Sequence, residues 1–314
     1  MKLGAAIDIG GTNTAFGLVN EQGNILLQDT VLTKEYPDPK ELVKVVCEKI
    51  KKLLPAKSEL IGVGIGAPNG NYFNGTIEFA PNLQWKGVVP LAKYFSDSLN
   101  CKAVLTNDAN AAALGEMLFG GAKGMKDFLF INLGTGLGSG IVVNGELVYG
   151  HDGFAGELGH VIVRPDGRLC GCGRKGCLET YCSATGIVTT YIGRVKSEEL
   201  RVKSEELRVG SVDAKYIFER AREGEKEAIE TFNVTGGWLG LALANSVAYT
   251  SPEAIFLFGG LANAGDFLFK PTKESFEKNL LNIYKNKIKI LPSQLRETDA
   301  AILGAASLIW DENR

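Results

Sequence analysis

Hydrophobic positions at the start of the chain follow the pattern of β-strands. Small and apolar residues alternate through 3–9 and stop at a glycine pair, and further strand-like runs cover 14–19 and 25–32. The polar, glycine-containing stretch 21–24 separates the last two runs as a turn does. Apolar residues then recur with helical spacing over 40–54. The pattern predicts a three-stranded meander followed by a helix.

The same order of elements returns later in the chain. An apolar strand at 128–133 leads into a glycine-rich turn at 134–138, a second strand at 139–143 and a third at 146–149. Each meander therefore opens with a turn rich in glycine and threonine, which predicts a duplicated core. Further predicted elements are strands over 60–66, 103–106, 254–258 and 287–291 and helices over 110–119 and 299–310.

A tandem heptapeptide stands between the predicted elements. RVKSEEL at 194–200 is followed at once by an identical copy at 201–207. A seven-residue unit keeps Val and Leu on roughly one helical face, so a short coiled-coil contact is one interpretation. The other is a local duplication that lengthens a surface helix or loop. Two copies are too few for a stable coiled coil, which favours the duplication.

Composition and charge narrow the class of protein. The length of 314 residues fits two domains of ordinary size. The net charge of -2 gives no general attraction to nucleic acid or to an anionic membrane. The charged Asp8 follows too few apolar residues for the core of a signal peptide. Apolar runs such as 254–258 are too short to span a bilayer. We therefore expect a cytoplasmic protein with reduced cysteines.

The first Gly/Thr turn has two interpretations. Gly10 and Gly11 let backbone N–H groups approach a phosphate, and Thr12 and Asn13 add side-chain contacts. Asp8, directly before the turn, is suited to hold the associated magnesium through water. An ordinary hairpin turn explains the same residues equally well.

Two further turns extend the phosphate hypothesis. The turn of Gly134, Thr135 and Gly136 fits the loose Gly-x-Gly pattern, but it leads into a strand, whereas a dinucleotide fingerprint leads into a helix. One Gly/Thr turn in each half suggests a phosphate chain held between two domains. Gly259 and Gly260 follow the strand at 254–258 and either face a nucleotide base or ribose, or form a plain strand-to-helix turn.

A cluster of His and Cys residues predicts a metal site. His160, Cys170, Cys172 and Cys177 supply one imidazole and three thiolates, a ligand set of tetrahedral structural zinc. Small cysteines also pack in cores, but three within eight residues in a reducing compartment favour the metal. We call the segment 160–177 the knuckle.

The turns resemble the phosphate and adenosine motifs of the sugar kinase, hexokinase, heat-shock-70 and actin superfamily. Leu-Thr-Asn-Asp-Ala-Asn at 105–110 places a carboxylate directly after a short strand. Glu-Leu-Gly-His at 157–160 and the Cys-rich stretch 170–179 complete a pattern that closely resembles the repressor, open-reading-frame and kinase (ROK) family. The resemblance covers essentially the whole chain.

The resemblance implies a fold and a division into domains. The expected class is α/β, with two actin-like (ribonuclease H-like) domains and a cleft between them. Residues 1–118 with 298–314 would form the smaller domain. Residues 119–297 would form the larger one, which carries the knuckle. Sugar would lie in the cleft, with ATP mostly on the larger domain.

The resemblance also implies residue roles for a kinase that uses ATP with Mg²⁺ to phosphorylate the 6-hydroxyl of glucose. Asp108 would accept the proton of the sugar hydroxyl, although for an isolated residue a helix cap is the better interpretation. His160 would give one ring nitrogen to zinc and the other to sugar. The implied sugar-binding residues are Gly70, Asn82, Asn107, Asp108, Glu157, His160 and Glu179.

Several alternatives stay open within the family. The substrate is glucose by resemblance around Glu157, His160 and Glu179, with fructose, N-acetylglucosamine and N-acetylmannosamine as alternatives. A non-catalytic sugar-sensing regulator is the alternative from another class. Repressor members carry a helix-turn-helix domain before the first hairpin, whereas Asp8 already lies in that hairpin here. A homodimer is a family expectation.

Overall fold

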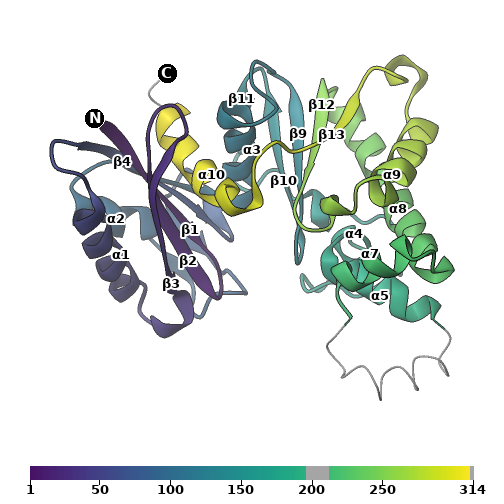
Figure 1. Ribbon diagram of the computed structural model, residues 1–314, viewed down its shortest axis with the longest axis horizontal. Coiled ribbons are helices and arrows are strands. Elements are labelled where there is room, and N and C mark those ends of the chain that lie inside the picture. Colours follow the sequence, from purple (N-terminus) through teal and green to yellow (C-terminus); the bar gives the residue numbers. More distant parts are fainter. Residues whose placement is uncertain (196–211, 312–314) are drawn as a thin grey trace. The chain divides into compact units, whose positions relative to one another are not determined.

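The computed structural model describes residues 1–195 and 212–311 (Figure 1), so the tandem heptapeptide lies almost wholly outside the described residues. The chain divides into two compact units. Unit 1 comprises Met1–Lys126, Gly140–Gly156 and Ser293–Arg314, and unit 2 comprises Asp127–Ser139 and Glu157–Pro292. The expected domains, 1–118 with 298–314 and 119–297, stay a prediction.

The first sheet lies in unit 1 and has the strand order β3-β2-β1-β4-β8. Its strands are β1 (Lys2–Ile9), β2 (Asn13–Val19), β3 (Ile25–Leu32), β4 (Glu59–Ala67) and β8 (Ala103–Asn107). β2 pairs with β1 and β3 in antiparallel fashion, whereas β1, β4 and β8 run parallel. The carboxyl ends of these three parallel strands therefore meet at one edge of the sheet.

Helices cover both faces of this sheet. α1 (Pro39–Leu53) and α2 (Leu91–Leu99) lie together, and α3 (Asp108–Phe119) packs with α10 (Glu297–Asp311), as Figure 1 shows. A Cβ on Gly64 of β4 would lie 1.8 Å from the carbonyl oxygen of Ala305, so only glycine lets α10 approach this closely. A smaller sheet consists of β5 (Gly70–Asn71), β6 (Thr76–Glu78) and β7 (Val88–Val89).

The second large sheet repeats the order of the first. Its order is β11-β10-β9-β12-β13, and β12 runs parallel to β9 and β13. The strands are β9 (Phe128–Leu133), β10 (Leu137–Val143), β11 (Glu146–Leu147), β12 (Ala254–Phe258) and β13 (Lys289–Pro292). In both sheets the third, second, first, fourth and fifth strands stand side by side, which confirms the duplicated core.

Unit 2 adds a group of helices beyond its strands. They are α4 (Glu179–Cys182), α5 (Ala184–Arg194), α7 (Ala214–Arg222), α8 (Lys226–Thr250) and α9 (Asp266–Asn279). α8 and α9 lie side by side, and a Cβ on Gly240 would lie 2.3 Å from the carbonyl oxygen of Thr272. Short 3₁₀ turns occur at Thr33–Glu35, Leu158–His160, Ala262–Ala264 and Asn282–Tyr284. Within the described ranges, no helix has both the length and the apolar character needed to cross a bilayer.

Element ends differ from the predictions by a few residues. The helix expected over 110–119 begins at Asp108, because the side-chain oxygen of Asn107 caps it by accepting the Ala109 N–H. The strand expected over 146–149 ends at Leu147, and the strand expected over 287–291 is Lys289–Pro292.

Candidate active site and metal centre

Two carboxyl groups stand at the carboxyl edge of the first sheet. Asp8 lies near the end of β1, and Asp108 is the first residue of α3, directly after β8. They flank Gly66 of β4: a Cβ on Gly66 would lie 3.4 Å from Oδ1 of Asp8 and 3.7 Å from Cα of Asp108. Parallel strand ends thus bring together two side chains that are 100 positions apart in the sequence.

The surroundings make both carboxyl groups hold a proton more tightly than free aspartate does. Burial raises the pKa of Asp8 to about 7, and the nearby charge of Asp108 adds to the shift. Desolvation by the surrounding protein atoms also raises the pKa of Asp108, although its Oδ1 accepts the Ala109 N–H at 2.8 Å, which opposes the shift. Perturbed carboxyl groups of this kind are typical of functional sites.

Asn107 takes the capping role that was the alternative interpretation of Asp108. Its side-chain oxygen accepts the Ala109 N–H at 2.8 Å, which leaves its amide nitrogen as a donor for another group. The structure therefore places the cap and the candidate base on consecutive residues, with Asp108 inside the first turn of α3.

The first Gly/Thr turn and the loops that contain Gly70 and Asn82 lie beside this edge. The Gly10 N–H donates to the Asn13 carbonyl at 2.9 Å and closes the turn. A Cβ on Gly11 would lie 2.5 Å from the Asn82 carbonyl oxygen, so this turn and the Asn82 loop are in contact. A Cβ on Gly70 would lie 2.4 Å from the carbonyl oxygen of Thr106, at the end of β8. Gly11, Thr12 and Asn13 are exposed.

The other two turns meet in unit 2, because β9 and β12 are parallel neighbours. The Leu261 N–H donates to the Leu133 carbonyl at 3.3 Å. Gly259 has φ +95°, and a Cβ there would lie 2.7 Å from the same carbonyl oxygen, so glycine is required for both reasons. Gly134, Thr135 and Gly260 line a cavity of about 640 Å³.

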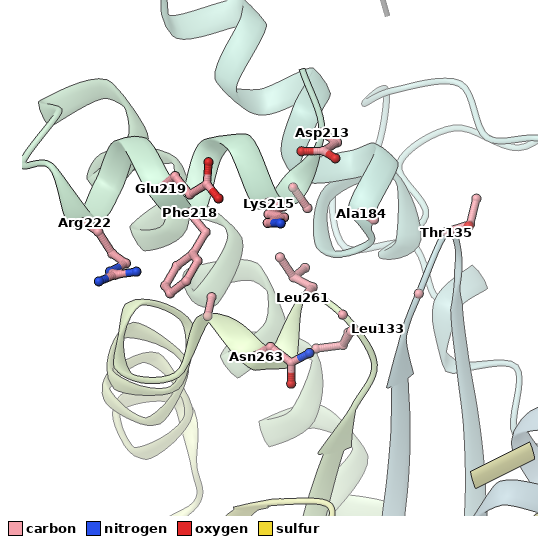
Figure 2. A pocket seen from close by; sticks show the side chains of 14 residues that line it. Leu133, Thr135, Ala184, Asp213, Lys215, Phe218, Glu219, Arg222, Leu261 and Asn263 are labelled. Carbon is pink, nitrogen blue, oxygen red and sulfur yellow. The ribbon is translucent and has the colours of Figure 1, made fainter. Parts of the chain in front are cut away.

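Helix α7 forms the opposite wall of this cavity. Figure 2 shows Lys215 and Phe218 of α7 facing Leu261 and Asn263. Sequence reasoning missed the α7 residues, since no local motif links a helix at 214–222 to turns at 134–136 and 259–260. The wall combines apolar surface with charges of both signs, from residues Asp213, Lys215, Phe218, Glu219 and Arg222.

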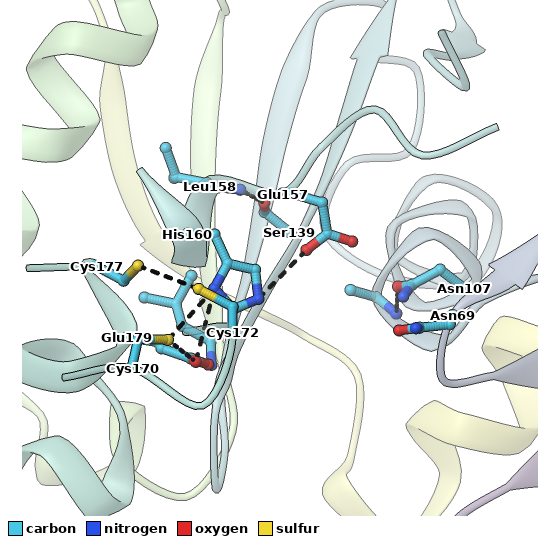
Figure 3. Close-up of polar contacts among 12 residues, drawn as sticks. Asn69, Asn107, Ser139, Glu157, Leu158, His160, Cys170, Cys172, Cys177 and Glu179 are labelled. Carbon is cyan, nitrogen blue, oxygen red and sulfur yellow. Dashed lines mark hydrogen bonds and ion pairs between the residues drawn. The ribbon is translucent and has the colours of Figure 1, made fainter. Parts of the chain in front are cut away.

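The four predicted metal ligands converge on one point. The ligand atoms of His160, Cys170, Cys172 and Cys177 all lie within 4.8 Å of one another (Figure 3). Nδ1 of His160 is 3.6 Å from Sγ of Cys170, and Sγ of Cys172 is 3.6 Å from Sγ of Cys177. Hydrogen bonds at Arg174 lower the pKa of Cys172 to about 6, which favours the thiolate that metals bind. One imidazole and three thiolates fit tetrahedral zinc.

The same histidine faces two carboxylates. Its Nδ1 points to the thiols, while Nε2 lies 4.0 Å from Oε2 of Glu157 (Figure 3). Oε1 of Glu179 accepts the Cys170 thiol at 3.0 Å, and Oε2 accepts the Leu137 N–H at 3.4 Å. Glu157, His160 and Glu179 therefore lie together, and Glu179 connects the His/Cys cluster to the start of β10.

Comparisons with known proteins agree on the family of this chain. A family model described as the ROK family matches residues 4–312. A glucokinase of Streptomyces coelicolor is 35% identical over 316 residues, 98% of each chain. A glucokinase of Thermotoga maritima is 36% identical over 305 residues, 96% of each chain. A ROK family glucokinase from Streptomyces griseus, crystallised with glucose and AMPPNP, has a TM-score of 0.80 at 35% identity, covering 98% of each chain.

Proposed function

This chain belongs to the ROK family, and on that premise we propose that it is a glucokinase, which transfers a phosphoryl group from ATP to the 6-hydroxyl of glucose. It has the two-domain actin-like fold of the ROK sugar kinases that it resembles. The observation that carries the proposal is the carboxyl of Asp108, whose pKa is raised, at the edge of the first sheet beside Asp8 and the Gly70 loop.

Asp108 serves as the general base in this proposal. Its carboxylate accepts the proton of the 6-hydroxyl while the hydroxyl oxygen attacks the γ-phosphorus of ATP in line. A raised pKa brings the basicity of a carboxylate closer to working pH, where proton acceptance is most effective. Asn107 donates its amide N–H to a neighbouring sugar hydroxyl, and the loops of Gly70 and Asn82 complete the contacts from unit 1.

Unit 2 supplies acceptors for sugar hydroxyl groups. Glu157 and Glu179 each offer carboxylate oxygens, and hydroxyl groups are donors that need such partners. Nε2 of His160 faces away from the thiols and adds a third polar contact. The glucokinase relatives support glucose over fructose, N-acetylglucosamine and N-acetylmannosamine as the preferred substrate.

The glycine turns bind the nucleotide. The turns at Gly10–Asn13 and Gly134–Gly136 give backbone N–H groups to the phosphates. The cavity beside Gly259 and Gly260 takes the adenosine, with Phe218 and Leu261 as apolar surfaces. Magnesium bound with ATP would neutralise phosphate charge, and Asp8 would hold it through water. The Streptomyces griseus relative was crystallised with an ATP analogue, which supports this assignment.

The knuckle holds a structural zinc ion in this proposal. His160 Nδ1 and the thiolates of Cys170, Cys172 and Cys177 provide four ligands with no open position. The ion would fix the orientation of the imidazole, so that Nε2 stays directed at sugar. Assembly as a homodimer and a cytoplasmic location belong to the same proposal, and light scattering after size exclusion tests the first.

A panel of hexoses tests the proposal against its alternatives. The purified protein is incubated with ATP, Mg²⁺ and glucose, fructose, N-acetylglucosamine or N-acetylmannosamine, and ADP release is followed. We expect the highest kcat/KM with glucose. A higher value with an N-acetyl sugar would make the protein an amino-sugar kinase. Sugar binding without ADP release would support the sensor instead.

A further inference from the structure

Arg168 lies in the knuckle, but its side chain reaches out to a different part of unit 2. Nη1 donates to the carbonyl oxygens of Thr180 at 2.6 Å and Gly186 at 3.0 Å, and Nη2 donates to Oγ1 of Thr190 at 3.0 Å. The guanidinium also lies over the ring of Tyr181, 4.6 Å from its centroid. One side chain thus holds the carbonyl groups of α4 and of the first turn of α5.

The backbone of Arg168 is fixed to the knuckle at the same time. Its carbonyl accepts the Gly176 N–H at 2.8 Å, next to the ligand Cys177. Its own N–H donates to the hydroxyl of Tyr181 at 3.0 Å. The main chain of this residue is therefore bonded both to the knuckle and to Tyr181 of α4, while its guanidinium is bonded to α4 and α5.

The start of α5 in turn holds the second Gly/Thr turn. The Ala184 N–H donates to the Gly134 carbonyl at 2.9 Å, and the Thr185 hydroxyl donates to the Thr135 carbonyl at 3.0 Å. Ser183 caps α5 by accepting the Gly186 N–H at 3.0 Å. Arg168 binds the carbonyl of that same Gly186, so the chain of contacts from knuckle to turn is continuous.

We propose that Arg168 is a positioning residue that couples the metal-bound knuckle to the turn Gly134–Gly136, so that nucleotide affinity depends on this side chain. The identity of the nucleotide as ATP rests on the proposed function. Charge-assisted bonds from a planar, five-donor group hold several acceptors at once, which a neutral side chain of similar length does not do. Loss of the metal would weaken nucleotide binding through the same residue.

Arg168→Met removes the donors and keeps most of the side-chain length, and Arg168→Lys keeps the charge but not the planar fork. Arg164→Met is the matched control, because it makes the same change at an exposed arginine of the same segment. Binding of AMPPNP with Mg²⁺ is measured by calorimetry without sugar, and zinc by elemental analysis. For Arg168→Met we expect Kd to rise at least ~10-fold, with about one zinc per chain retained. Arg168→Lys should show a smaller rise and Arg164→Met none beyond twofold.

Amide hydrogen exchange supplies a second measurement that needs no ligand. In Arg168→Met the Ala184 amide should exchange faster than in the wild type. Chelating zinc from this variant should not increase the exchange rate of Ala184 further. In the wild type, chelation alone should speed this exchange. A folded Arg168→Met protein with wild-type exchange at Ala184 and a Kd within twofold would overturn the proposal.

Two further outcomes separate this inference from the proposed function. If Arg168→Met does not fold, Arg168→Lys decides by the same two measurements. If the wild type binds no AMPPNP, the proposed function fails, and exchange at Ala184 alone decides whether Arg168 couples knuckle and turn. In an active enzyme the variant should raise KM for ATP and keep kcat within about threefold, because saturating ATP restores the bound state.

Discussion

Replacing the carboxyl of Asp108 by an amide separates its chemical role from its structural one. In Asp108→Asn the side-chain oxygen still accepts the Ala109 N–H, a bond of 2.8 Å in the wild type, so the first turn of α3 should persist. The amide, however, has no basic oxygen for the proton of the sugar hydroxyl. A positioned general base contributes ~10²–10⁴-fold to rate, so kcat should fall at least ~10²-fold, about 3 kcal/mol of transition-state stabilisation.

The same substitution has a second effect that is read independently. The charge of Asp108 helps to raise the pKa of Asp8 to about 7, so the variant should titrate Asp8 at a lower pH. A coupled assay of ADP release gives kcat, and NMR of the carboxyl carbon of Asp8 gives its pKa. Calorimetry gives the affinity for glucose, which should change only a few-fold. Asp38→Asn is the matched control, since Asp38 also accepts a backbone N–H at a helix start, at 2.9 Å from Lys40. A folded Asp108→Asn enzyme with kcat within tenfold of the wild type would refute the role of Asp108.

Three further changes probe other parts of the molecule. The folded-state pKa of Asp8, about 7, exceeds its ordinary value of 3.8, so the folded state binds the proton more tightly and stability falls as pH rises between these values. Asp8→Asn removes that loss. The stability advantage of this variant, measured as free energy of unfolding in urea titrations without Mg²⁺, should grow by about 3 kcal/mol from pH 4 to 7; a pH-independent difference would contradict the shift. Cys172→Ala should lower both zinc content, from about one per chain, and glucose affinity, whereas a zinc-free wild type with full activity would exclude the metal site. Deleting 201–207 should leave kcat/KM nearly unchanged, and loss of activity or assembly would assign the repeat a role.

Features set by local chemistry could be predicted from the sequence. The glycine turns are recognisable because only glycine allows the close approaches at Gly11 and Gly259. The metal ligands are recognisable because three cysteines and a histidine fall within eighteen positions. The repeated meander predicts the duplicated sheets because strand alternation and turn residues recur in the same order.

Features set by packing between distant segments could not be predicted. The α7 wall of the cavity beside Gly134 and Gly260 carries no motif of its own and lies there only through tertiary structure. Gly236 and Gly240 of α8 allow α9 to approach closely, and α9 contains Pro271, which ordinarily argues against a helix. The strands of the smallest sheet have two or three residues, which is too few to show the alternation of apolar and polar residues typical of a strand.

The position of the transferred phosphate tests the central claim most directly. Wild-type protein is incubated with glucose, ATP and Mg²⁺, and the product is examined by phosphorus–proton correlation NMR. The account predicts stoichiometric ADP and a phosphate coupled to the protons of carbon 6 of glucose. A folded protein that binds glucose yet forms no phosphorylated sugar, or that places the phosphate on another carbon, would contradict it.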